Sequence, residues 1–203
     1  MKMSKPILLF IVLVLIAGGI YYLEKTKIKI PEEIKSGKNN ITEELKEGKY
    51  KKSPELTGIS GYLNTENITI ESLKGKVVLI DFWTYTCINC IRTLPYLTSW
   101  DDKYRNMGLV IIGVHTPEFI FEKDYENVKN AVEKYNIKYP VVQDNDYLTW
   151  KAFDNHYWPR KYLIDSEGYI RYDHIGEGGY EETEEKIREL LDEIGRNTKN
   201  IET

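Results

Sequence analysis

The sequence is poor in the residue types that build structural metal sites. It has 2 cysteines and 3 histidines among 203 residues, whereas a structural zinc site takes four such ligands. His115, His156 and His174 lie without ligand spacing relative to Cys87 and Cys90, which disfavours zinc binding at the cysteine pair. A disulfide between Cys87 and Cys90 would close a very short loop and would stabilise the fold only slightly. A purely structural disulfide is therefore disfavoured as well.

No stretch of the chain is strongly basic or strongly acidic. The formal net charge is -4, and lysines and arginines are interspersed with acidic residues, so nothing predicts a nucleic-acid surface. Residues 24–52 are rich in Lys, Glu, Asn and Gly, which is typical of a polar spacer that lets a domain turn toward its partners. We expect residues 53–196 to form the folded domain and residues 197–203 to form a polar tail.

Only one long apolar run is present, at residues 7–23, after a short flank at residues 1–6. As a helix, these residues would span roughly 25 Å, which predicts a transmembrane anchor. The alternative is a cleaved signal peptide, because residues 17–19 are small and follow an apolar core. We favour the anchor, because the apolar run continues to Leu23. No cysteine lies near this run, which excludes attachment through a lipidated cysteine.

The chain is organised around the stretch at residues 77–90. Residues 77–80 form a continuous apolar, β-branched run that is typical of a buried strand. Residues 91–100 then space their apolar side chains as a helix does, which places Cys87 at the helix N-terminus and Cys90 one turn inside it. Unpaired backbone N–H groups and the helix dipole would stabilise a thiolate at Cys87, while Cys90 would be close enough to attack a mixed disulfide.

The rest of the domain alternates apolar strand patterns with helical ones. A strand, a helix and a second buried strand in succession predict a right-handed crossover between parallel strands, and therefore an α/β fold. The patterns predict further strands at residues 67–70, 109–114, 139–143, 161–165 and 169–175, and further helices at residues 128–135, 147–153 and 182–194.

The cysteine motif carries a family resemblance. Asp81-Phe82-Trp83, followed after three residues by Cys87-x-x-Cys90, resembles the active-site strand and helix of thioredoxins. The longer string Trp-Thr-Tyr-Thr-Cys-Ile-Asn-Cys, then Arg-Thr-Leu-Pro-Tyr-Leu at residues 92–97, resembles the extracytoplasmic thioredoxin-like domains of the TlpA/ResA group, and within it the domain of DipZ-type proteins. Over residues 53–194 the resemblance implies a thioredoxin-like fold, a mixed central sheet flanked by helices, with an N-terminal β-hairpin and a central insertion, preceded by one transmembrane helix.

The resemblance implies a catalytic role for three residues. Cys87 would be the nucleophile, Cys90 the resolving cysteine, and Asp81 the buried carboxylate that accepts the proton of Cys90. An aspartate that ends an apolar strand is costly to bury unless it has such a task. His115 and Glu118 follow the second buried strand at its carboxyl end, where α/β folds place functional groups. They are further candidates, and an ordinary hydrogen-bonding or surface role is the alternative.

Four more residues are expected to bind the substrate. Pro159 matches the cis-proline of thioredoxin-like proteins, which exposes the preceding backbone to pair with a substrate segment. The alternative is a trans proline that starts an edge strand. The resemblance places Trp83, Trp158 and Gly176 at the border of the same site, where the glycine permits close backbone contact.

These residues predict a protein-disulfide reductase that needs no cofactor beyond the redox-active disulfide Cys87–Cys90. Ile88 and Asn89 give a thiolate no cationic help, so we expect a moderately low potential. The resemblance implies a CcdA/DsbD-like membrane electron donor, a domain on the extracytoplasmic side of the cell membrane, and disulfide-containing protein substrates such as apocytochrome c. Thr93 stands where ResA-type members carry a glutamate, which puts a strict role in cytochrome c maturation in doubt.

Other functions on the same fold stay open. A thiol peroxidase of the peroxiredoxin type would use Thr84 and Cys87 as a Thr-x-x-Cys motif, although the upstream proline of that motif is absent. A copper chaperone of the Sco type needs one more residue between its cysteines and a suitably placed histidine. A non-catalytic adaptor would use only the surface around Trp158 and Pro159.

Overall fold

The computed structural model describes Ile16, Lys46 and residues 48–199. The predicted transmembrane segment at residues 7–23 and most of the spacer at residues 24–52 lie outside the described residues. Within the described part, no helix is both long enough and apolar enough to cross a membrane. The chain divides into two units, and the fold below belongs to the second unit, Leu45–Thr203.

A six-stranded mixed sheet forms the centre of this unit, in the order β1-β4-β3-β2-β5-β6. Strands β2, β3 and β4 run parallel, whereas β1 pairs antiparallel with β4, and β5 pairs antiparallel with both β2 and β6. The predicted mixed sheet is therefore confirmed. The strands are β1 (Gly61–Leu63), β2 (Val77–Trp83), β3 (Leu109–His115), β4 (Val141–Gln143), β5 (Arg160–Ile164) and β6 (Ile170–Ile175).

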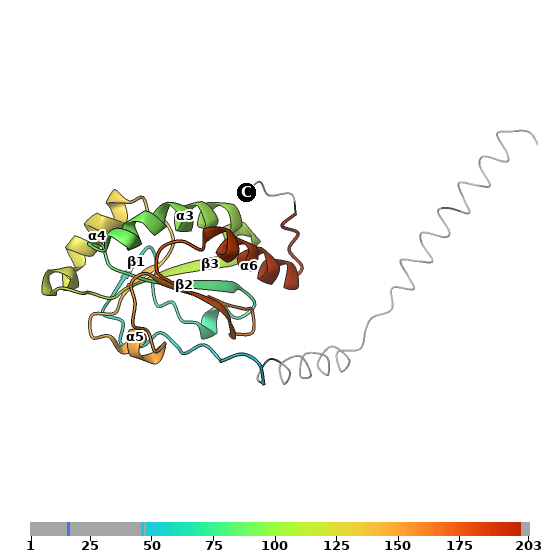
Figure 1. Cartoon of the computed structure of the whole chain (residues 1–203), viewed down its shortest axis with the longest axis horizontal. Coiled ribbons are helices and arrows are strands. Elements are labelled where there is room, and N and C mark those ends of the chain that lie inside the picture. The colour runs from blue at the N-terminus through green and yellow to red at the C-terminus, as the bar shows by residue number, and fades with distance from the viewer. Residues whose placement is uncertain (1–15, 17–45, 47, 200–203) are drawn as a thin grey trace, which may run out of the picture. The chain divides into compact units, whose positions relative to one another are not determined.

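Helices cover both faces of the sheet. Helices α3, α4 and α6 lie on one face and α5 lies on the other (Figure 1). The predicted central insertion falls on the segment of η3 and α4, between β3 and β4 in the chain. The α-helices are α3 (Ile88–Tyr104), α4 (Tyr125–Lys134), α5 (Leu148–Ala152) and α6 (Tyr180–Glu193), and three short 3-10 helices are η1 (Glu71–Leu73), η2 (Arg105–Met107) and η3 (Ile120–Lys123).

Strand β2 contributes side chains to two separate hydrophobic cores, because successive side chains of a strand point to opposite faces of the sheet. We call the core under α3, α4 and α6 the first core, and the core on the α5 face the second core. Cys90 belongs to the first core. Asp81 lies two residues from Trp83 in β2, so its side chain points to the face of the first core as well. From β2, the first core contains Val77, Leu79 and Trp83, and the second contains Val78, Ile80 and Phe82.

The predicted strand at residues 67–70 is wrong, and the described residues before β2 contain one strand, β1, rather than a hairpin. The physical reason lies in the backbone and in Glu55. Asn67 has a positive φ of 48°, which interrupts an extended chain. The backbone N–H groups of Ile70 and Glu71 then donate to the carboxylate of Glu55, at 2.6 and 3.0 Å, instead of to a neighbouring strand.

The chain joins the folded unit before the expected boundary at residue 53. Lys46 Nζ lies 3.0 Å from the buried Asp165 carboxylate, in the turn between β5 and β6. Lys52 forms an antiparallel bridge with Tyr169 in the same turn, and Ser53 N donates to Gly168 O at 2.8 Å. The last part of the predicted spacer is therefore attached to the domain.

Candidate active site

Cys87 occupies the N-cap of α3. Its backbone is extended, and its Sγ accepts a hydrogen bond of 3.3 Å from the backbone N–H of Cys90. The side chain is half-buried, so a substrate can reach the sulfur. Its hydrogen bond with the Cys90 thiol, helped by the backbone N–H groups of Cys90 and Asn89, lowers the pKa of Cys87 to about 7. A large fraction of Cys87 is therefore thiolate at neutral pH, as a nucleophile requires.

Cys90 has the opposite environment. It lies one turn inside α3, is 1% exposed, and packs in the first core. Burial raises the pKa of Cys90 far above its usual range, and the neighbouring Cys87 and Asp81 add to this effect. The two thiols are thus unequal: Cys87 can attack an incoming disulfide, while Cys90 stays protonated until a base removes its proton.

Asp81 and Lys161 face each other at the base of the site. They are paired in the antiparallel register of β2 and β5, and their side chains are 1% and 0% exposed. Burial raises the pKa of Asp81 to about 7, although Lys161 opposes the shift. Burial likewise lowers the pKa of Lys161, opposed by Asp81 and Cys90. Asp81 can therefore exchange a proton near neutral pH.

The loop before β5 lies next to the carboxyl end of β2, because Arg160 pairs with Phe82. The peptide bond between Trp158 and Pro159 is cis, the isomer that the resemblance implies. Gly176 is brought to the same place: its N–H donates to Pro159 O at 2.8 Å, and its carbonyl accepts from Lys161 Nζ at 3.3 Å. Its φ of 84° is a conformation that favours glycine. The indole N–H of Trp158 donates to Thr116 O at 3.1 Å, which joins this loop to the end of β3.

Trp83 and His115 lie beneath the site and not on its surface. Both are 0% exposed, so neither offers a surface to a substrate. Their rings pack edge to face, 5.3 Å apart. Gly113 makes room for the indole, since a Cβ there would lie 2.9 Å from Trp83 Nε1. Burial lowers the pKa of His115 to about 4, so the imidazole is neutral at physiological pH. His115 lies under the loop before Cys87, where its Nε2 is 3.4 Å from Thr84 Oγ1 and its ring stacks on Tyr85.

Glu122 is a site residue that the sequence patterns did not reveal. The Glu118 side chain is exposed, but Glu122 is 0% exposed. Its carboxylate accepts hydrogen bonds from Thr86 Oγ1 at 2.5 Å and from the N–H of Phe119 at 2.9 Å. Burial acts to raise the pKa of Glu122, but these hydrogen bonds outweigh it and the pKa is lowered. The one available sequence signal was a glutamate three residues after Phe119, the N3 position of a helix start.

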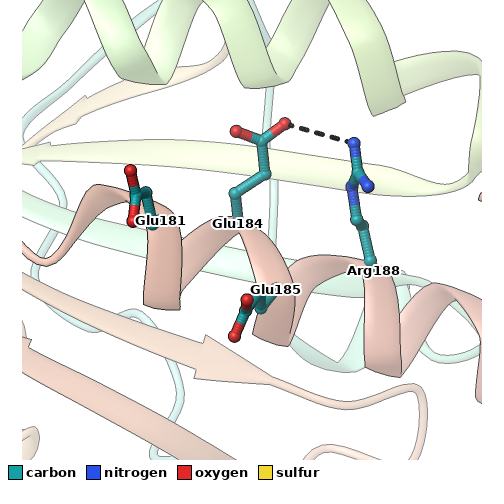
Figure 2. Close-up of a pocket in the computed structure, with 4 residues that line it drawn as sticks. All are labelled: Glu181, Glu184, Glu185 and Arg188. Atoms are coloured by element: carbon teal, nitrogen blue, oxygen red, sulfur yellow. Dashed lines mark ion pairs between the residues drawn. The ribbon is translucent and has the colours of Figure 1, made fainter. Parts of the chain in front are cut away.

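A hollow of about 270 Å³ lies over α6, lined by Glu181, Glu184, Glu185 and Arg188 (Figure 2). Glu184 accepts hydrogen bonds from Trp100 and Tyr104, near the end of α3. These residues are roughly 20 Å along the helix from Cys87, so the hollow is separate from the dithiol. Among the described residues, no group of three or more His, Cys, Asp or Glu side chains is placed to hold a metal ion.

The fold and the site together define the thioredoxin-like class of dithiol proteins: a half-buried, low-pKa cysteine at a helix N-terminus, a buried partner cysteine one turn further, and a cis-proline in the loop before β5. A family model supports this class. The Redoxin model matches residues 49–191, and the chain belongs to that family.

Curated relatives narrow the class. Protein DipZ of Mycobacterium bovis is 49% identical over 144 residues, which cover 70% of this chain and 21% of that protein. The chain thus spans about a fifth of the length of this relative. Thiol-disulfide oxidoreductase YkuV of Bacillus subtilis is 33% identical over 141 residues, which cover 69% of this chain and 94% of YkuV. The protein is therefore a TlpA/ResA-like member of the thioredoxin-like group.

A solved structure agrees with this placement. The solution structure of a thioredoxin-like protein in its oxidised form has a TM-score of 0.65 and 32% identity, and the match covers 71% of this chain and 97% of that one.

Proposed function

We propose that this protein reduces disulfides of protein substrates on the extracytoplasmic side of a membrane. The observation that carries the proposal is the inequality of the two thiols, since the pKa of Cys87 is lowered to about 7 and the pKa of Cys90 is raised well above its usual range. A reductase needs a first thiolate that attacks without activation and a second thiol that reacts only after the mixed disulfide has formed.

The reaction proceeds in two exchange steps. The Cys87 thiolate attacks one sulfur of the substrate disulfide, a Cys87–substrate bond forms, and the other substrate sulfur leaves as a thiolate that takes a proton from water. Cys90 then gives its proton to the Asp81 carboxylate and attacks Cys87 Sγ. The Cys87–substrate bond breaks, the reduced substrate leaves with two electrons, and the Cys87–Cys90 disulfide remains.

Return of the enzyme to the dithiol requires two electrons from another dithiol. We propose a membrane protein of the CcdA/DsbD type as the donor, and anchoring of this chain through residues 7–23. The apolar run in the sequence and the similarity to the DipZ and ResA proteins support both parts. Residues Ile88 and Asn89 between the cysteines bring no cation to the thiolate, which favours a low potential over an oxidising one. Apocytochrome c is one candidate substrate within this proposal.

The test is the reduction potential of the purified full-length chain, measured by equilibration with dithiothreitol or glutathione and thiol trapping. A value well below about -220 mV supports a reductase, whereas a value near or above about -130 mV overturns it in favour of an oxidant or isomerase. Cys90→Ser should accumulate mixed disulfides with its partners, because the resolving thiol is missing. Cys87→Ser is the matched control and should trap none.

A further inference from the structure

The segment between β3 and α4 presents three large apolar side chains to water. Phe119, Ile120 and Phe121 are 49%, 88% and 54% exposed. The rings of Phe119 and Phe121 stack in parallel, with centroids 5.5 Å apart and an angle of 4°. Three consecutive exposed apolar residues are unfavourable in a monomeric surface unless they have a partner. We call Phe119, Ile120 and Phe121 the apolar rim.

A buried carboxylate holds the rim in place. Glu122 Oε2 accepts hydrogen bonds from the backbone N–H groups of Glu118 and Phe119, at 2.6 and 2.9 Å. Its Oε1 accepts from Thr86 Oγ1, in the residue directly before Cys87. Burying a charged group is costly, and here its hydrogen bonds attach the exposed rim to the cysteine loop.

The backbone carbonyls at the end of the rim also accept hydrogen bonds from neighbouring side chains. Phe121 O accepts hydrogen bonds from Tyr85 Oη at 3.3 Å and from Asn127 Nδ2 at 3.0 Å. The carbonyl of Lys123, two residues further on, accepts from Gln143 Nε2 at 3.2 Å. A surface that is already ordered loses little conformational entropy when a partner binds, which favours affinity.

The rim is continuous with the face that carries Cys87. The Tyr85 ring lies 6.4 Å from the Phe121 ring and stacks on His115. The Glu118 carboxylate is near enough to Cys87 to oppose ionisation of the thiol. Ile88, directly after Cys87, is 57% exposed. A protein whose disulfide reaches Cys87 therefore passes next to the rim.

We propose that the apolar rim is a docking surface for apolar side chains of the substrate polypeptide, in the extended segment next to the disulfide that Cys87 attacks. The inference rests on the proposed function, because it assumes a protein disulfide at Cys87. The exposed acidic residues Glu118 and Asp124 flank the rim and outnumber the neighbouring exposed cation Lys123. They disfavour an anionic lipid surface as the occupant and favour basic residues near the apolar ones in the substrate.

The test compares two synthetic peptides, each with one internal disulfide. One carries Phe and Leu next to its cysteines, and the other carries Ser and Gly. The full-length chain reduces each peptide, and also hydroxyethyl disulfide, with dithiothreitol as the electron source. Ile120→Ser and the double variant with Phe121→Ser are compared with Leu148→Ser. Leu148 is a matched apolar residue, 46% exposed, that lies on α5.

We expect the unmodified chain to favour the apolar peptide in kcat/KM by about ten-fold, equal to about 1.4 kcal/mol. The rim variants should reduce this preference to about two-fold, mainly through a higher KM, and Leu148→Ser should keep it. The proposal is wrong if the unmodified chain shows no preference for the apolar peptide, or if the rim variants keep that preference. Lipid or a second copy of the chain would then be the occupant of the rim. If the unmodified chain reduces none of the three disulfides, the proposed function itself is wrong.

Discussion

Asp81 and Lys161 lie opposite each other across β2 and β5, and both side chains are almost completely buried beneath Cys90. Each charge opposes the pKa shift that burial causes in the other. The pair thus places an acid and a base, both shifted toward neutral pH, where the proton of Cys90 has to go.

Asp81→Asn should stabilise the protein at alkaline pH. Because burial raises the pKa of Asp81 to about 7, the native state holds this proton more tightly than the unfolded chain, whose pKa is about 3.9. The resulting stability is complete below about pH 4 and is lost as the pH rises to about 7. Asparagine has no titratable proton, so the variant does not lose this stability as the pH rises. Relative to the unmodified chain, we expect Asp81→Asn to gain a few kcal/mol in the free energy of unfolding between pH 4 and pH 8, as measured by urea titration. A gain independent of pH would contradict the shifted pKa.

Lys161→Met should slow the resolving step at neutral pH. Lys161 lowers the pKa of Asp81, so its removal raises that pKa further and leaves less carboxylate to accept the Cys90 proton. A rise of about one unit would reduce the step roughly five-fold at pH 7 and move its pH midpoint upward. The rate is measured as loss of the mixed disulfide after rapid mixing. Arg160→Met removes a cation from the next residue, which pairs with Asp173, and should leave the midpoint in place.

Replacing Cys90 should raise the pKa of Cys87. The largest cause of the low pKa of Cys87 is its hydrogen bond with the Cys90 thiol. Cys90→Ala removes this donor, while Cys90→Ser keeps a hydroxyl donor at the same place. The pH midpoint of alkylation by iodoacetamide should therefore be near 7 in the unmodified chain, higher in the alanine variant, and between the two in the serine variant. Equal midpoints in the two variants would exclude the side-chain hydrogen bond as the cause.

Glu122→Ala should destabilise the fold by about 1–3 kcal/mol, because it leaves the backbone N–H groups of Glu118 and Phe119 without their acceptor. Urea unfolding at pH 7 measures the change. Glu126→Ala, at an exposed position of α4, is the control and should stay within about 0.5 kcal/mol. A cost for Glu122→Ala no larger than that of the control would show that Glu122 does not hold the loop.

The sequence predicted the part of the site that is local in the chain. A β-branched apolar run, two cysteines and a helical spacing follow one another within residues 77–104, so the strand, the N-cap at Cys87 and the helix could all be read directly. The mixed sheet and helix α6 could be predicted from equally long patterns. The burial of Trp83 could not be predicted, because an aromatic residue next to a motif can face either a substrate or a core.

The missed residues depend on contacts between distant parts of the chain. Lys161 follows a proline and an arginine, a context typical of a surface strand, and only the register with β2 places it against Asp81. Glu122 directly follows the exposed apolar rim, and its burial depends on its contact with Thr86. The expected strand at residues 67–70 failed because Glu55 takes its backbone hydrogen bonds. In each case the deciding partner lies 15 or more residues away.

The alternation of side chains along β2 gives the sheet one face on which Asp81 and Cys90 lie and one face on which neither lies. Positions that bury Asp81 and Cys90 set the pKa values of both groups, so changes there alter proton transfer. Val78, Ile80 and Phe82 pack on the opposite side, away from both cysteines, although Phe82 contacts Trp150, which packs on Trp158 next to Pro159. The second core around Val78 and Ile80 can therefore be redesigned for heat resistance while the thiols keep their surroundings, provided that the contact between Trp150 and Trp158 is retained.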